Sequence, residues 1–133
     1  MNAKLEQAKH LLIERLSPSL LIVFGSSAKG TERPDSDLDI AFLSSEQIDE
    51  YQIFMIAEEL AAILNKDVDL VDLARVSTVF QMQVLSSGQV LYETDERQRM
   101  DFEMKTYKMY AKLNEERQPV LDQIDKSGSI YEK

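Results

Sequence analysis

Hydrophobic and polar positions repeat with two different periods along the chain, and the change of period separates helices from strands. Apolar residues recur at helical spacing among charged ones over residues 3–16, which predicts an amphipathic helix that Ser17-Pro18 ends. Residues 20–24 are apolar throughout, which is typical of a strand covered on both faces. We therefore expect a helix followed directly by a buried strand.

Residues 37–43 alternate between apolar and other positions, as a strand does. Leu38, Ile40 and Phe42 would face one side of the sheet, and Asp37, Asp39 and Ala41 would face the other. The two aspartates therefore share one face of the predicted strand.

The remaining elements follow from the same patterns and from residues that begin or end helices. We expect a helix that begins at a capping box at Ser44–Gln47, runs to Leu64 and ends at Asn65. A strand over 67–73 should follow, and then a short helix that Ser77 caps and that ends near Gly88. The last elements should be an edge strand over 89–92 and a long polar helix over 95–117. We expect the tail over 126–133 to be frayed. Residues 1–133 then form a single α+β domain, a small mixed β-sheet with helices packed on it and a long C-terminal helix.

The long C-terminal helix carries two apolar stripes on nearly opposite sides. We expect the first stripe, formed by Met100, Met104, Tyr107 and Ala111, to pack on the domain. The second stripe consists of Phe102, Met109 and Leu113. Because a monomer needs only one stripe, we interpret the second as a partner-binding or dimer surface, the alternative being a helix that is buried more deeply.

Composition and charge narrow the classes of function. The 133 residues suffice for one domain with a core, and the chain contains no cysteine, which indicates a reducing, cytoplasmic setting. No apolar run is long enough to span a bilayer, and the N-terminus lacks a signal-peptide pattern. The formal net charge of −9 does not favour long nucleic acid as a partner.

Gly25-Ser26 follows the first strand and leads into a segment long enough for one helical turn. Backbone N–H groups at such a turn can bind phosphate, and the Ser26 hydroxyl and Lys29 ammonium can add donors. On its own the pair of residues is weak evidence for phosphate binding, because many strand-to-helix turns carry Gly-Ser for geometry alone.

Asp37 and Asp39 follow this turn at the start of the second strand. Two carboxylates on one strand face can bind or bridge divalent cations, and without a cation their repulsion is costly. The alternative is a solvated edge strand kept from aggregating by its acids. The apolar opposite face makes that alternative less favourable.

A third carboxylate would complete the site. Asp69 lies mid-strand on the side opposite to Val68 and Leu70, as the first two aspartates lie opposite to their apolar neighbours. Asp67 shares that face at the strand entry and stays the alternative. Asp72 lies on the other side, where we expect it to cap or to form an ion pair.

The spacing Gly25-Ser26, ten residues, Asp37-x-Asp39 resembles the signature of the DNA polymerase β-like nucleotidyltransferase superfamily, and the resemblance covers about residues 10–92. The chain is similar in length to its minimal nucleotidyltransferases. The segment from Phe102 to Arg117 resembles the MntA-type antitoxins of HEPN/MNT (type VII) toxin–antitoxin systems. The helix over 95–117 would then bind the partner.

The resemblance implies an enzyme that transfers AMP from ATP to a tyrosine of a cognate HEPN-domain ribonuclease toxin (HepT-like). Asp37, Asp39 and Asp69 would be the catalytic and metal-binding residues for two Mg²⁺ ions, and Gly25, Ser26 and Lys29 would bind the nucleotide. Two rival hypotheses stay open: transfer to a small hydroxylated molecule such as an aminoglycoside, and a non-catalytic antitoxin that acts by binding alone.

Overall fold

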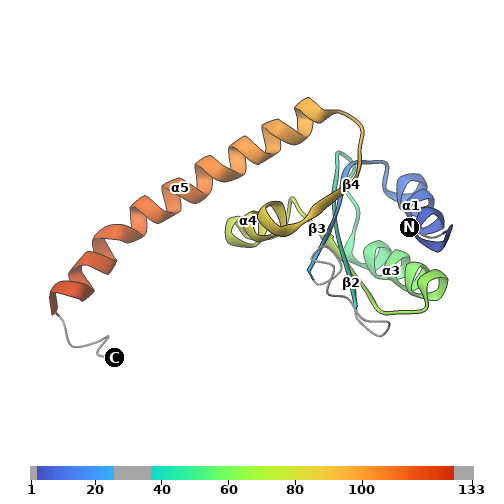
Figure 1. Ribbon diagram of the computed structural model, residues 1–133, viewed down its shortest axis with the longest axis horizontal. Helices are drawn as coiled ribbons and strands as arrows, with labels where there is room; N and C mark the ends of the chain where they lie inside the picture. The colour runs from blue at the N-terminus through green and yellow to red at the C-terminus, as the bar shows by residue number, and fades with distance from the viewer. Residues whose placement is uncertain (1–2, 26–36, 128–133) are drawn as a thin grey trace.

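A four-stranded mixed β-sheet forms the centre of the computed structural model, which describes residues 3–25 and 37–127, with side chains up to residue 116. In chain order the elements are α1 (Ala3–Leu16), β1 (Pro18–Phe24), β2 (Leu38–Ser44), α3 (Glu50–Leu64), β3 (Val68–Asp72), α4 (Thr78–Ser87), β4 (Gln89–Glu93) and α5 (Glu96–Ser127) (Figure 1). The strand order is β3-β2-β1-β4, with β1 antiparallel to both neighbours and β2 parallel to β3. This architecture confirms the predicted α+β class.

The first face of the sheet is covered by α1 and α3 (Figure 1). Leu12 and Leu16 of α1 and Leu60 of α3 are fully buried against Ile40 and Phe42 of β2. The helical spacing of α1 and the period-two alternation of β2 thus bring apolar side chains into one core.

The opposite face is covered by α4 and α5, which lie on the other side of the sheet in Figure 1. Its core contains Leu20 and Ile22 of β1, Ala41 of β2 and Val84 of α4. Because β1 contributes side chains to both cores, its sequence is apolar at successive positions, as the sequence indicated.

The predicted start of α3 at Ser44 was wrong. Ser44 ends β2, and its hydroxyl donates a hydrogen bond to the carbonyl of Leu16 at 2.7 Å. The capping box lies further on: Asp49 accepts a hydrogen bond from the Gln52 backbone, and the Gln52 side chain accepts one from the Asp49 backbone. Because the hydroxyl of Ser44 is hydrogen-bonded to the end of α1, it does not cap a helix, and α3 begins after the capping box at Asp49.

Other predicted helix ends are confirmed. Asn65 ends α3 in the left-handed conformation, Ser77 caps α4, and Gly88 follows its last turn. The C-terminal helix was predicted too short, because α5 continues to Ser127 instead of ending near Arg117. No helix in the described part of the chain is long and apolar enough to cross a membrane.

The predicted packing face of α5 was also wrong. Met100, Met104 and Tyr107 are 54%, 58% and 42% exposed, whereas Phe102 packs on the α4 side of the sheet and Thr106 is buried. The sequence of a helix with two apolar stripes does not indicate which stripe packs on the domain. The side of α5 that packs contains the polar residue Thr106, so its sequence is less apolar than that of the exposed side.

Arg99 fixes the start of α5 against the end of β4. Its guanidinium bonds Glu93 at 2.6 Å and Glu103 at 3.0 Å, and Glu96 lies 3.5 Å away. One side chain therefore ties the last residue of β4 to the first two turns of α5. This contact sets the direction in which α5 leaves the sheet.

The packing of α5 can be tested with a pair of alanine substitutions. We expect Phe102→Ala to lower the free energy of unfolding by on the order of 2 kcal/mol, because it removes a partly buried aromatic ring. Met104→Ala should change it by less than about 0.5 kcal/mol, because the side chain is exposed. Urea unfolding followed by circular dichroism measures both, and the reverse order of effects would contradict the observed packing.

Candidate active site

Gly25 lies directly against Asp39 where β1 ends. Phe24, the last residue of β1, pairs with Asp39 of β2 in the antiparallel register. Gly25 then takes a φ of 77°, and a Cβ atom at this position would overlap the Oδ2 atom of Asp39. Both the backbone conformation and the close carboxylate require a glycine here.

The parallel register of β2 and β3 brings two aspartates side by side. Asp39 pairs with Asp69, just as Ile40 pairs with Leu70 on the next position. Ile40 and Leu70 belong to the core under α1 and α3, so the two carboxylates project from the opposite face. The sequence predicted this orientation for both aspartates, and the structure confirms it.

The pairing changes the acidity of Asp39. Burial, a hydrogen bond to Asp69, and the negative charges of Asp69 and Asp37 together raise the pKa of Asp39 from 3.8 to about 6. The protonated carboxyl group of Asp39 is the donor to Asp69, so the pair holds one proton in mildly acidic solution. A cation placed between the two carboxylates would remove the same repulsion.

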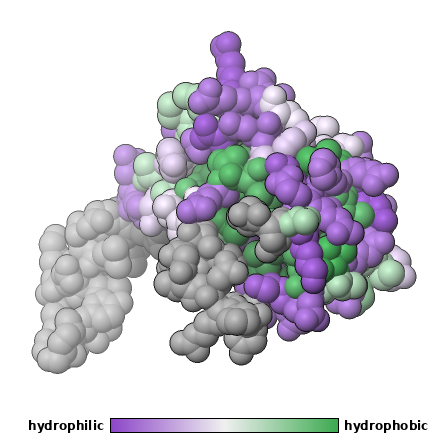
Figure 2. Space-filling view, turned by 45° about the vertical axis from the view of Figure 1, so that its right-hand side comes forward, coloured by the Kyte–Doolittle hydropathy of each residue, from purple (hydrophilic) through white to green (hydrophobic). Residues whose placement is uncertain are grey.

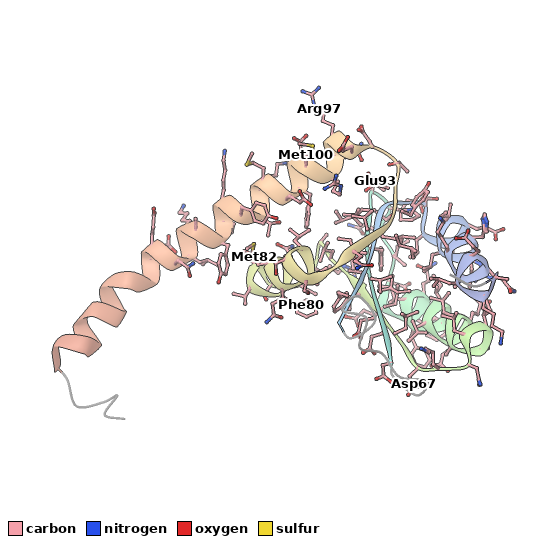
Figure 3. The ribbon with its side chains drawn as sticks, in the orientation of Figure 1. Asp67, Phe80, Met82, Glu93, Arg97 and Met100 are labelled. Carbon is pink, nitrogen blue, oxygen red and sulfur yellow. The ribbon has the colours of Figure 1, made fainter. Side chains whose placement is uncertain are left out.

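The other two predicted carboxylates lie at strand entries. Asp37 is exposed and precedes β2, and Asp67 is exposed and precedes β3, where its backbone carbonyl accepts a hydrogen bond from Leu38. Asp67 points away from the sheet at the edge opposite to α5 (Figure 3). Among the residues that the structure describes, no group of three or more His, Cys, Asp or Glu side chains is arranged to hold a metal ion.

Two neighbouring carboxylates, without further protein ligands, are a donor set that suits Mg²⁺. This ion is commonly bound by one or two carboxylates together with water and the phosphates of a substrate. Asp39 and Asp69 would supply the hard oxygen ligands. Burial and the neighbouring carboxylate of Asp69 raise the pKa of Asp39, and a bound cation would lower it again.

Asp72 is separate from this site, as the sequence indicated. Its carboxylate accepts a hydrogen bond from the Ala74 backbone at 3.1 Å and forms an ion pair with Arg75 at 3.2 Å. The predicted phosphate-binding residues Ser26 and Lys29 lie outside the described residues. Of the predicted nucleotide-binding set, the structure therefore places Gly25 alone.

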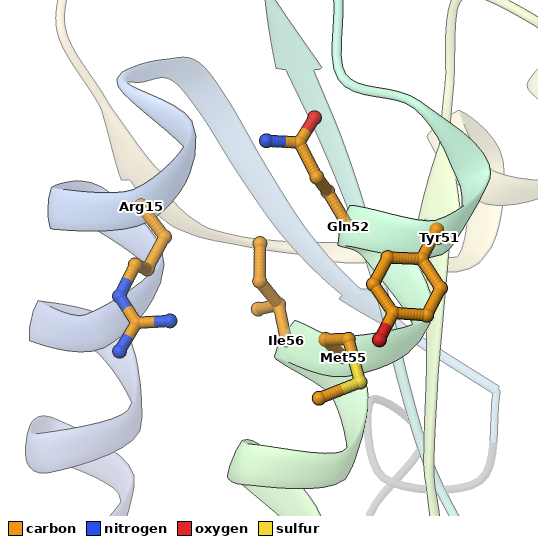
Figure 4. A pocket seen from close by; sticks show the side chains of 5 residues that line it. All are labelled: Arg15, Tyr51, Gln52, Met55 and Ile56. Carbon is orange, nitrogen blue, oxygen red and sulfur yellow. The ribbon is translucent and has the colours of Figure 1, made fainter.

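A pocket of about 280 Å³ lies on the other side of the molecule, between α1 and α3. Arg15 of α1 and Tyr51, Gln52, Met55 and Ile56 of α3 line it (Figure 4). In Figure 2, hydrophobic residues reach the surface in the middle of the molecule, with hydrophilic residues around them. The pocket is on the face opposite to the aspartates and does not belong to the carboxylate site.

The structure adds two features that the sequence reasoning missed. The first is the contact of Gly25 with Asp39, which makes the glycine a part of the carboxylate site as well as a turn. The second is the exposed row of Met100, Met104 and Tyr107 on α5, which the sequence predicts to pack on the domain. Of the predicted partner-binding stripe, Phe102 packs against the core, whereas Met109 is 49% exposed and Leu113 is half-buried.

This combination of sheet, glycine turn and carboxylate pair matches a known class of enzyme. Residues 6–97 match the family model described as polymerase beta, nucleotidyltransferase. The chain therefore belongs to the polymerase beta nucleotidyltransferase family.

Individual relatives are more specific. The chain is 40% identical to the protein adenylyltransferase MntA of Shewanella oneidensis over 105 residues, 79% of this chain and 75% of the relative. It superposes with a TM-score of 0.79 and 36% identity on a chain in the crystal structure of a toxin–antitoxin with AMP-PNP, covering 92% of this chain and 98% of that one. A second match is a chain in the complex of tri-AMPylated Shewanella oneidensis HEPN toxin with MNT antitoxin, with a TM-score of 0.76 and 34% identity over 91% and 95% of the two chains.

The raised pKa of Asp39 predicts how the stability of the metal-free protein depends on pH. The folded protein keeps the Asp39 proton up to about pH 6, whereas the unfolded chain releases it near pH 3.8. The folded state binds more protons between these values, so Asp39 makes stability fall as pH rises through this window. Above pH 6, Asp39→Asn should therefore be more stable than wild type, by on the order of 1 kcal/mol after allowance for solvent screening.

Urea unfolding in EDTA at pH 4 and pH 8 measures this difference. The advantage of the variant should be present at pH 8 and nearly absent at pH 4. An Asp39→Asn variant that is less stable than wild type at pH 8 would show that Asp39 is satisfied without a cation.

Proposed function

We propose that this nucleotidyltransferase is a protein adenylyltransferase antitoxin, which transfers AMP from ATP to a tyrosine of a cognate HEPN toxin. The observation that carries the proposal is the Asp39–Asp69 pair, held on neighbouring strands beside the close turn at Gly25. The similarity to a protein adenylyltransferase and to an antitoxin crystallised with an AMPylated HEPN toxin supports the choice of acceptor.

In the proposed reaction the tyrosine oxygen attacks the α-phosphorus of ATP and pyrophosphate leaves. Asp69 accepts the proton of the tyrosine hydroxyl, and Asp37 and Asp39 would serve as metal ligands beside it. Gly25, with Ser26 and Lys29, binds the β- and γ-phosphates. A glycine at position 25 supports this role, because a side chain there would fill the space beside the Asp39 carboxylate.

Mg²⁺ is the metal that we propose for this site, with Asp37, Asp39 and Asp69 as its protein ligands. When bound, Mg²⁺ would neutralise the carboxylates and the triphosphate and stabilise charge as it moves to the leaving group. The Asp39–Asp69 pair supports this assignment independently of the relatives, because burial together with the hydrogen bond to Asp69 and the charge of Asp69 raises the pKa of Asp39.

We further propose that the chain acts as one catalytic domain whose C-terminal helix binds the toxin, and that it works in the cytoplasm. The family match ends at residue 97, at the start of α5, so the helix lies beyond the catalytic part. ATP is a cytoplasmic nucleotide, which supports that location for the enzyme.

The direct test is transfer of label from [α-³²P]ATP to purified cognate HEPN toxin in the presence of Mg²⁺. We expect Asp39→Asn to lower the rate at least about 100-fold, because a neutral amide cannot replace the charged ligand. Asp72→Asn is the matched control, since Asp72 lies on a neighbouring strand but bonds Ala74 and Arg75 instead. The control should retain transfer within about threefold of wild type.

Each alternative function has its own outcome in this assay. Label on a small hydroxylated acceptor and none on the toxin would assign the enzyme to small-molecule modification. Inhibition of the toxin by wild type and by Asp39→Asn alike, without label, would indicate an antitoxin that acts by binding alone. Either result would overturn the proposed reaction.

The glycine turn gives a second test. We expect Gly25→Ala to reduce transfer strongly, because the new Cβ atom would displace the Asp39 carboxylate and the φ of 77° disfavours alanine. The double variant Gly25→Ala/Asp39→Asn should show little further loss, since both changes act on the same carboxylate. Transfer by Gly25→Ala at the wild-type rate would contradict the role of this contact.

A further inference from the structure

The exposed side of α5 carries a narrow apolar row that the fold does not use. Met100, Met104, Tyr107 and Ala111 follow one another at intervals of four, three and four residues, and all four are exposed. This is the a/d spacing of a helix that packs along another helix. The opposite side of α5 carries the buried Thr106 and Phe102, which packs against the core on the α4 side of the sheet.

The row extends along a helix that leaves the rest of the molecule. With 32 residues, α5 is about 48 Å long, and Figure 1 shows its C-terminal half lying away from the sheet and the other helices. Met100 and Arg97 point outward near the start of the helix (Figure 3). A row of this kind on an extended helix is a surface on which a partner helix can lie.

The similarity of the chain to one from a toxin–antitoxin complex indicates which partner contacts the row. The nucleotidyltransferase family model ends at residue 97, so nearly all of α5 lies beyond the part of the chain that the model matches. The toxin–antitoxin structure with AMP-PNP nevertheless covers 92% of this chain, which leaves out about 11 residues, far fewer than the 32 of α5. Most of α5 is therefore shared with a chain that is crystallised with its toxin.

The position of α5 also suits the transfer of a group to a bound protein. α5 packs on the sheet face that carries Ala41, and Asp39 projects from the same face of β2, two residues earlier. A partner on α5 is thus held on the side of the sheet where the carboxylates point. A second copy of the chain would fit less well, because each copy has a net charge of −9.

We propose that the row of Met100, Met104, Tyr107 and Ala111 is the surface on which the cognate HEPN toxin docks, through an amphipathic helix with a matching apolar row. The assignment rests on the proposed function for the identity of the toxin. Arg97 and Lys108 are exposed on one side of the row, where carboxylates of the toxin helix can pair with them.

The test compares two double variants of the full chain. Met100→Glu/Met104→Glu places two charges in the row, and Phe54→Glu/Met55→Glu places two charges on exposed residues of α3, on the other face of the sheet. Calorimetry measures binding to purified toxin and, separately, to AMP-PNP with Mg²⁺. Initial rates of AMP transfer give KM for the toxin and kcat.

We expect the α5 variant to bind toxin at least about 100-fold more weakly, with a raised KM for toxin, an unchanged kcat and unchanged binding of AMP-PNP. The α3 variant should match wild type in every measurement. Circular dichroism should show that both variants are folded, and the neutral Met104→Gln variant should show a smaller loss in the same direction.

Three results would overturn the docking surface: toxin binding by the α5 variant at wild-type affinity, loss of binding in the α3 variant alone, or sedimentation of the wild-type chain as a dimer that the α5 variant dissociates. The proposed reaction fails separately. A wild-type chain that binds toxin through this row without transferring AMP would leave the docking surface standing and refute the enzyme activity.

Discussion

The parallel pairing of β2 with β3 is the constraint on which the site depends. It places Asp39 and Asp69 at the same level of the sheet, and the antiparallel neighbour β1 then delivers Gly25 against the first of them. Burial of Asp39 and its closeness to Asp69 disfavour the charged form of this carboxyl group and raise its pKa to about 6. The fold accepts this cost because both strands are anchored by apolar side chains on their other face, where Ile40 and Leu70 contribute to the core.

One face of the sheet carries the larger core, and the other face carries the candidate catalytic aspartates. The face under α1 and α3 is closed by fully buried leucines and by an ion pair between Arg15 and Glu59 at the surface. The carboxylates project from the other face, on which α4 and α5 pack. Under the proposed function the acceptor approaches from this side of the sheet, on which α5 also packs.

Much of this arrangement could be predicted from the sequence, because it follows from local periodicity. The alternation over residues 37–43 and the apolar neighbours of Asp69 predict which way the aspartates point, and the structure agrees. The start of α3 could not be predicted, because Ser44 and Asp49 both offer capping chemistry and only the tertiary contact of Ser44 with Leu16 decides between them. The packing face of α5 failed for a similar reason: Phe102 and the methionines lie on competing stripes, and the choice depends on the surface that the sheet presents.

The central claim is that Asp39 and Asp69 form a charged pair that needs a cation. Its most direct test is the titration of the Asp39 carboxyl carbon by ¹³C NMR in the metal-free protein and again with Mg²⁺ and AMP-PNP. The account predicts a midpoint near 6 without metal, where the pKa is raised by burial and by Asp69. With Mg²⁺ and the nucleotide the midpoint should fall below about 4, because the cation stabilises the charged form. A midpoint near 4 in the metal-free protein would contradict the account, since the carboxylate would then be stable without any cation.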